Sequence, residues 1–186
     1  ILFGISKGGF AGPSSILAIP IMSLSMGPAT AAGILLPIIL IMDFIAIYLY
    51  WKTWDLKNIK IIIFPAIMGI IIGSITFQFI SADSIRILVG LICILFVFLA
   101  SFKKDNLFFK PTKNKGRLWS FVSGYTSTII HAGGQPLSIY LLPQKLNKTV
   151  YVGTMTFTFL IVNLIKIIPY HFLDLLIITN LKISLI

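Results

Sequence analysis

Long runs without charge constrain this sequence more than any other feature. Five runs contain no Asp, Glu, Lys or Arg, and they cover residues 8–42, 61–82, 87–102, 118–144 and 150–165. A helix that crosses a bilayer needs about 20 consecutive, mainly apolar residues. Charged residues make up only 11% of the chain, whereas about a quarter of a soluble domain is charged. The sequence therefore predicts an all-α polytopic membrane protein.

Turn residues and charges divide the chain into about seven spans of an expected eight. We expect spans over residues 1–26, 29–51, 59–80, 85–102, 118–143 and 149–170, and a further one that starts near Leu173. The chain begins and ends inside apolar stretches, so we interpret it as a fragment of a single transmembrane domain, residues 1–186, without complete terminal helices.

The basic residues predict the orientation in the membrane. Nine of the fifteen lie in two loops: Lys52, Lys57, Lys60, Lys103, Lys104, Lys110, Lys113, Lys115 and Arg117. An excess of Lys and Arg marks cytoplasmic loops. This placement leaves Arg86, Lys145 and Lys148 in the outer loops. Because the positive charge is confined to short loops, it does not indicate a nucleic-acid groove, and no nucleic-acid partner is expected.

A repeat relates the two halves of the chain. A shift of 123 positions places Pro13 on Pro136, Pro20 on Pro143 and Asp43 on Lys166. Each copy reads as a basic residue, paired glycines, a proline and a short apolar run. We therefore expect two tandem four-helix repeats, over residues 1–102 and a truncated 118–186, joined by a basic cytoplasmic loop over 103–117. If the glycine segments span the membrane, four spans separate the two copies and the repeats are parallel. If the segments are re-entrant, the number of spans between the copies changes, and the relative orientation of the repeats changes with it.

The paired glycines predict broken helices. Secondary transporters often build their substrate site from discontinuous helices at corresponding positions of two repeats. Glycine lets the backbone approach a ligand closely, and the start of the new helical piece offers N–H groups to an anion. The candidate substrate-binding residues are Lys7, Gly8, Gly9, Gly12, His131, Gly133, Gly134 and Gln135. In the alternative interpretation, the glycines serve only packing and kinks.

Charged and polar residues within the spans form a second group of candidates. Asp43 lies about 12 Å of helix before Trp51, too deep for a carboxylate to reach the interface. Lys166 could instead extend to the interface, since it lies near Tyr170. We predict an Asp43–Lys166 ion pair, with Asn163 nearby, as a coupling site. His131 is either a proton-relay group or a hydrogen-bonded structural residue.

Several motifs resemble the sulfite exporter TauE/SafE family across nearly the whole chain. They are Gly4-Ile-Ser-Lys-Gly-Gly-Phe at 4–10, the stretch 33–43 that ends in Asp43, Ser123-Gly124, His-Ala-Gly-Gly-Gln-Pro at 131–136, and Gly153-Thr154 followed by Asn163 and Lys166. The resemblance implies a multi-pass protein of the bacterial inner membrane with about eight spans. It also implies export of sulfite or a small organosulfonate.

The favoured function is therefore a secondary transporter for a small inorganic or organosulfonate anion. Proton coupling and homo-oligomerisation fit this interpretation, and the lipid bilayer is the expected surrounding. The alternative is a channel or carrier for a different small solute, with the intramembrane charges structural or with Asp43 alone as the site. The residues offer no metal cluster, no nucleophile–base spacing and no nucleotide motif, so neither an enzyme nor a cofactor is expected.

Overall fold

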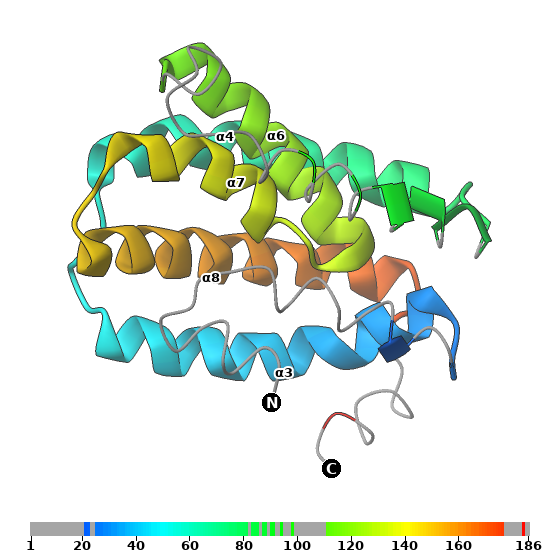
Figure 1. The fold of residues 1–186 in the computed structure, drawn as a ribbon. Helices are drawn as coiled ribbons and strands as arrows, with labels where there is room; N and C mark the ends of the chain where they lie inside the picture. Colours follow the sequence, from blue (N-terminus) through cyan, green and yellow to red (C-terminus); the bar gives the residue numbers. More distant parts are fainter. Residues whose placement is uncertain are drawn as a thin grey trace.

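The computed structural model describes residues 21–22, 25–81, 83–85, 87–88, 90–91, 94, 98, 111–176 and 184. This part of the chain is helical and contains no strand (Figure 1). Its elements are α3 (Pro28–Leu49), α4 (Leu56–Phe77), α6 (Lys113–Ile130), α7 (Gly134–Leu141), a short 3-10 helix, η4 (Leu142–Gln144), and α8 (Lys148–Phe172). The first copy of the predicted repeat motif, within residues 1–20, lies outside the described residues, and the repeat stays a prediction.

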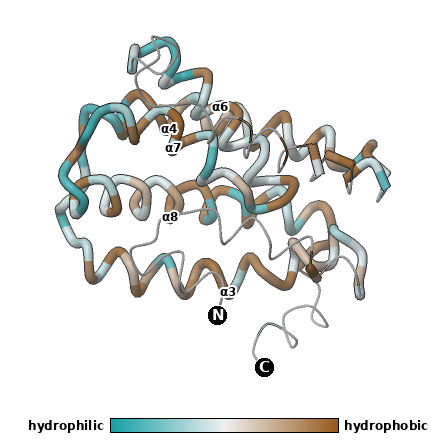
Figure 2. Tube along the Cα trace, in the orientation of Figure 1, coloured by the Kyte–Doolittle hydropathy of each residue, from teal (hydrophilic) through white to brown (hydrophobic). Residues whose placement is uncertain are grey.

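Three of the expected spans are present as helices long and apolar enough to cross a membrane. They are α3, α4 and α8, with 22, 22 and 25 residues. Apolar residues run along α3 and α4, and hydrophilic ones gather where the chain turns between them (Figure 2). Asp55 caps α4 by accepting a hydrogen bond from the Lys57 backbone N–H, and Asn147 caps α8 in the same way. The count of seven or eight spans stays a prediction.

Small residues let α4 and α6 pack closely. A side chain at Gly69 would overlap the backbone of Phe121, and one at Gly124 would overlap the carbonyl of Ala66. Gly69 and Gly73 therefore form a close-packing face on α4, with Gly124 of α6 as its counterpart. Gly73 lies against Thr128, so contacts advance in the same direction along both helices. α4 and α6 are parallel.

The expected single span over residues 118–143 is wrong. α6 ends at Ile130, and α7 returns toward the end of the bundle at which α6 began (Figure 1). A side chain at Gly116, near the start of α6, would meet the Tyr140 ring near the end of α7. Gln144, just beyond α7, exchanges hydrogen bonds with Asn58 at the start of α4. Residues 113–144 therefore form a re-entrant helical hairpin, because the chain turns between Ile130 and Gly134 instead of continuing as a kinked helix.

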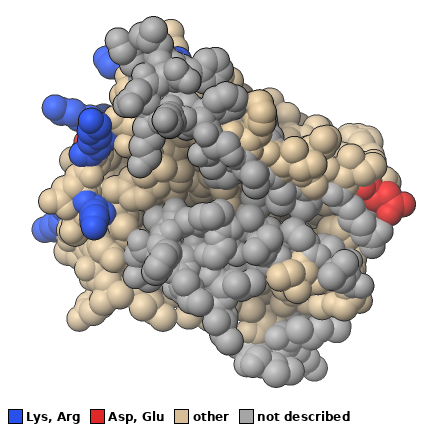
Figure 3. Space-filling view, in the orientation of Figure 1, with Lys and Arg blue, Asp and Glu red and all other residues tan. Residues whose placement is uncertain are grey.

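This hairpin also corrects the predicted place of two lysines. Lys145 and Lys148 follow the returning α7, so they lie at the same end as Lys52, Lys57 and Lys60, not in an outer loop. Figure 3 shows the visible Lys and Arg side chains at one end of the molecule, and an acidic side chain at the other. Among the described basic residues, Lys166 alone is not at this end. The positive-inside rule predicts that this basic end of the bundle faces the cytoplasm.

α8 lies in the middle of the bundle (Figure 1). It packs against α3 on one side, and against α4 and the α6–α7 hairpin on the other. A central helix of this kind can bury polar groups on more than one face, and α8 buries Thr154, Thr158, Asn163 and Lys166.

The close packing of α4 and α6 leads to a first prediction. Gly124→Ala should destabilise the protein by about 1–3 kcal/mol, because the added carbon overlaps backbone that cannot move aside cheaply. Gly90→Ala is the control, since a Cβ there would have open space around it. Thermal unfolding in detergent measures both. Equal unfolding temperatures for the two variants would contradict the α4–α6 packing.

Candidate functional site

The break between α6 and α7 begins at His131, which adopts an unusual backbone conformation. Its φ of 52° and ψ of 27° lie in the left-handed region, and its N–H donates to the Ser127 carbonyl to close the last turn of α6. Glycine usually occupies this position at a helix end. For any other residue the conformation costs roughly 1–2 kcal/mol. The fold therefore keeps a histidine here in spite of strain, which suggests that its side chain is needed.

Hydroxyl groups of α6 satisfy the backbone that the break releases. Ser123 Oγ donates to the Gly133 carbonyl at 2.7 Å, and Thr126 Oγ1 lies 3.4 Å from the Ala132 carbonyl. Irregular backbone at membrane depth needs such partners, because lipid offers none. A side chain at Gly133 would lie 2.6 Å from the Ser123 carbonyl oxygen and 2.8 Å from Ser127 Cβ, so only glycine fits.

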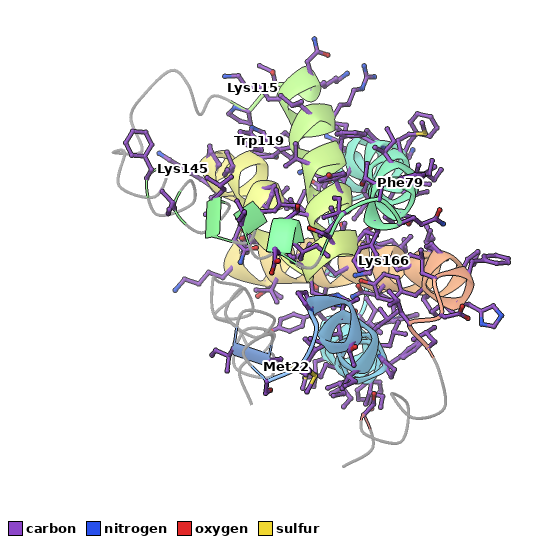
Figure 4. All side chains as sticks on the ribbon, turned by 90° about the vertical axis from the view of Figure 1, so that its right-hand side faces the viewer. Met22, Phe79, Lys115, Trp119, Lys145 and Lys166 are labelled. Atoms are coloured by element: carbon purple, nitrogen blue, oxygen red, sulfur yellow. The ribbon has the colours of Figure 1, made fainter. Side chains whose placement is uncertain are left out.

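Lys166 of α8 is fully buried and reaches the end of α6. Its Nζ donates to the Ser127 carbonyl oxygen at 2.9 Å and to Ser127 Oγ at 3.1 Å, and lies 2.8 Å from His131 Nδ1. Figure 4 shows it in the middle of the bundle, where α8 lies between α3 and α6. The interpretation in which Lys166 extends to the interface is therefore wrong, because it is held inside by acceptors on α6.

These contacts assign the His131 tautomer. Nε2 lies 3.0 Å from the Ala32 carbonyl oxygen of α3, which can only accept, so Nε2 carries the proton. Nδ1 then accepts from the Lys166 ammonium group. A second proton on His131, at Nδ1, would face the Lys166 amino group. His131 thereby joins α3, α6 and α8.

Asp43 of α3 belongs to the same buried region. It is fully buried, and its Oδ2 accepts a hydrogen bond from Asn163 Nδ2 at 2.6 Å. Asn163 and Lys166 lie three residues apart on α8, which puts them on one face with Cβ atoms about 5–6 Å apart. The carboxylate therefore lies on the face of α8 that carries the buried ammonium, and the direct Asp43–Lys166 pair stays a prediction.

The structure brings together most of the residues predicted from the second half of the chain. His131, Asn163, Lys166 and Asp43 form one buried polar cluster. Gly133 and Gly134 begin the next helix, and Gln135 lies buried in its first turn. From the first half of the chain, Lys7, Gly8, Gly9 and Gly12 lie outside the described residues.

Sequence reasoning missed three participants. Ser127 provides two acceptors for Lys166, Tyr170 donates from its hydroxyl to the Thr128 carbonyl at 2.5 Å, and Thr158 of α8 is a buried hydroxyl beside the break. The sequence does contain a signal for Ser127: residues 120–128 carry five Ser or Thr residues within an otherwise apolar run. Only helical contacts distinguish which of these hydroxyls face the site.

The geometry suits an anion. Ser127, which accepts from the buried Lys166 Nζ, lies one turn before the break, and α7 begins just after the break. Backbone N–H groups at the start of a helix favour a bound anion. Pro136 is the third residue of α7, where its missing N–H leaves no helical hydrogen bond unmade. In the described part of the chain, no group of three or more His, Cys, Asp or Glu residues could hold a metal.

Comparison with known proteins identifies the family. A model of the family "Sulfite exporter TauE/SafE" matches residues 1–185. The chain belongs to this family. No curated protein and no solved structure matches it. Membership in a transporter family and the apolar helices make the chain a multi-pass membrane protein of the TauE/SafE type, whose members are membrane transporters for sulfite or related anions.

The strained histidine can be tested with two substitutions. His131→Ala and His131→Gly both remove the hydrogen bonds to Ala32 and Lys166, but only glycine relieves the left-handed conformation. Both variants should unfold below the parent temperature in detergent, with the glycine variant about 1 kcal/mol more stable than the alanine variant. An alanine variant as stable as the glycine variant would contradict the observed φ.

The predicted ion pair can be tested with a double-mutant cycle. Asp43→Asn and Lys166→Met should each destabilise the protein by about 3–5 kcal/mol, because each leaves an opposite charge buried. The double variant should lose less than the sum of the two. Unfolding in detergent measures all four proteins. Additive losses would mean that the two charges do not interact.

Proposed function

We propose that the protein is a secondary transporter that exports a small anion, sulfite or an organosulfonate, across the bacterial inner membrane. The observation that carries the proposal is the re-entrant α6–α7 hairpin, whose break lies inside the bundle beside a buried lysine. Re-entrant or broken helices at membrane depth persist where they line a cavity or a site. Membership in the TauE/SafE family supports the direction and the class of solute.

The second half of the site would bind the anion at the start of α7. His131 and Lys166 supply one positive charge there, and Gly133 and Gly134 let the backbone approach the ligand. Lys7, Gly8, Gly9 and Gly12 would supply the other half, if the predicted repeat holds. The membrane potential, negative inside, already favours exit of an anion by about 2.3 kcal/mol per charge per 100 mV.

Proton coupling follows from the same cluster as a proposal. His131 and Lys166 contact each other, and Asp43 on the adjacent helix α3 bonds to Asn163 of α8. Entry of an anion would therefore change how protons are shared among His131, Lys166 and Asp43. Homo-oligomerisation is left open by these contacts.

Transport of labelled sulfite into inside-out vesicles tests the function. We expect saturable uptake by the parent and loss of uptake in Lys7→Ala. Gly134→Ala is a sharper probe, because its new methyl group would meet only Met155 Cε, at 4.0 Å, and the fold should tolerate it. If Gly134 lies against the anion, uptake should fall at least about tenfold while membrane insertion stays normal.

Gly90→Ala serves as the matched control, since its added methyl group also has space and Gly90 is not one of the candidate site residues. If the parent takes up no sulfite but transports another solute, the description of the fold stands and the proposed anion substrate is wrong. Normal uptake in both Lys7→Ala and Gly134→Ala would reject the placement of the site.

A further inference from the structure

Two buried polar side chains beside the break have no hydrogen-bond partner among the residues that the structure describes. They are Gln135, whose Nε2 and Oε1 are both unpaired, and Thr158, whose Oγ1 is unpaired. Only 3% and 1% of their surfaces are exposed. Buried polar groups are nearly always paired, and each exception needs an explanation.

The neighbouring hydroxyl groups, in contrast, are all hydrogen-bonded. Ser123 donates to the Gly133 carbonyl at the break, and Thr126 donates to the Val122 carbonyl within α6. Ser127 accepts from Lys166, and Ser138 donates to the Gly134 carbonyl at 2.7 Å. The fold therefore satisfies polar groups on α6 and α7 all around this point. Among the described residues, the buried side-chain atoms left unpaired are the amide of Gln135 and the hydroxyl of Thr158, on the two helices that meet there.

Gln135 and Thr158 are adjacent in sequence to the residues through which the start of α7 packs on α8. A Cβ at Gly134 would contact Met155, and one at Gly133 would approach Phe159 to 3.0 Å. Thr158 lies one turn after Met155 and directly before Phe159 on α8. Gln135 directly follows Gly134, in the first turn of a helix that no described side chain caps.

We propose that Gln135 and Thr158 form a site that binds a small oxyanion carrying a hydrogen-bond donor of its own. Singly protonated sulfite and a hydroxyl-bearing sulfonate are ligands of this class. This inference rests on the proposed function, and it narrows the substrate. Backbone N–H groups and the Gln135 amide N–H can donate to oxyanion oxygens, but Gln135 Oε1 can only accept. Thr158 Oγ1 does not donate to this oxygen in the structure, since both atoms are unpaired. An anion with acceptors alone would therefore leave Gln135 Oε1 unpaired and facing negative charge.

The test uses a matched pair of ligands of equal charge. Binding of 2-hydroxyethanesulfonate and of ethanesulfonate to the purified protein is measured at one pH by calorimetry. The two anions differ by one hydroxyl group, which Gln135 Oε1 or Thr158 Oγ1 would accept from. We expect the hydroxyl-bearing anion to bind at least about tenfold more tightly, and this preference to disappear in Gln135→Met and in Thr158→Val.

Stability without ligand gives an independent readout. Because the two groups are unpaired, Thr158→Val and Gln135→Met should raise the unfolding temperature of the ligand-free protein by a few degrees. Thr154→Val is the control on the same helix. Its Oγ1 accepts from the Asp55 N–H and donates to the Val150 carbonyl, so its loss should lower the unfolding temperature and leave the ligand preference unchanged.

The outcomes separate the two proposals. If both sulfonates and sulfite bind, but without preference for the donor, the inference is overturned and anion transport stands. The same holds if Thr158→Val and Gln135→Met lower stability as Thr154→Val does. If no sulfonate and no sulfite binds the parent, the proposed function is overturned, and the site proposed here falls with it.

Discussion

The burial of the Lys166 ammonium group is the constraint on which the rest of the described structure depends. A charge away from water must be paired and hydrogen-bonded. Lys166 meets this need with the carbonyl and hydroxyl of Ser127 and with His131 Nδ1. Ser127 lies in the last turn of α6, and His131 is the residue at which α6 ends. The position of α8 therefore depends on where α6 ends, because Lys166 needs the acceptors found there.

The strained backbone of His131 has a role in this arrangement. Its side chain accepts from Lys166 and donates to the Ala32 carbonyl, so one residue connects α8 and α3 at the point where α6 ends. The left-handed conformation places the His131 ring within hydrogen-bond distance of both partners, and these buried hydrogen bonds offset its cost. Asp43 and Asn163 extend the cluster along α8, so opposite charges share the interior.

Close glycine packing makes the re-entrant hairpin compatible with a compact bundle. Gly69, Gly73 and Gly124 bring α4 and α6 together as parallel neighbours, and Gly116 makes room for the returning α7 at Tyr140. All the turns described at that end carry Lys or Arg, so the hairpin explains the charge distribution better than a spanning helix does. The unpaired Gln135 and Thr158 then lie at the deep end of the hairpin, where a ligand would complete the polar pairing.

Composition and local pattern determined which class of protein this is. Charge-free runs predicted α3, α4 and α8 to within a few residues, and the family motifs predicted membership in TauE/SafE. The Gly-Gly-Gln-Pro segment predicted a broken helix, and the break is present between Ile130 and Gly134. These features follow from the sequence because helix length and glycine flexibility act locally.

Only the tertiary structure decided the direction of the chain after the break and the partners of the buried polar groups. Hydropathy cannot distinguish a spanning helix from a hairpin of the same length, since both bury apolar residues in lipid. The contacts of Gly116 with Tyr140 and of Asn58 with Gln144 settle this, and they join residues far apart in sequence. Ser127 as the partner of Lys166, and the unpaired state of Thr158, likewise depend on how helices face each other. The sequence alone contains no information on that geometry beyond the residue types themselves.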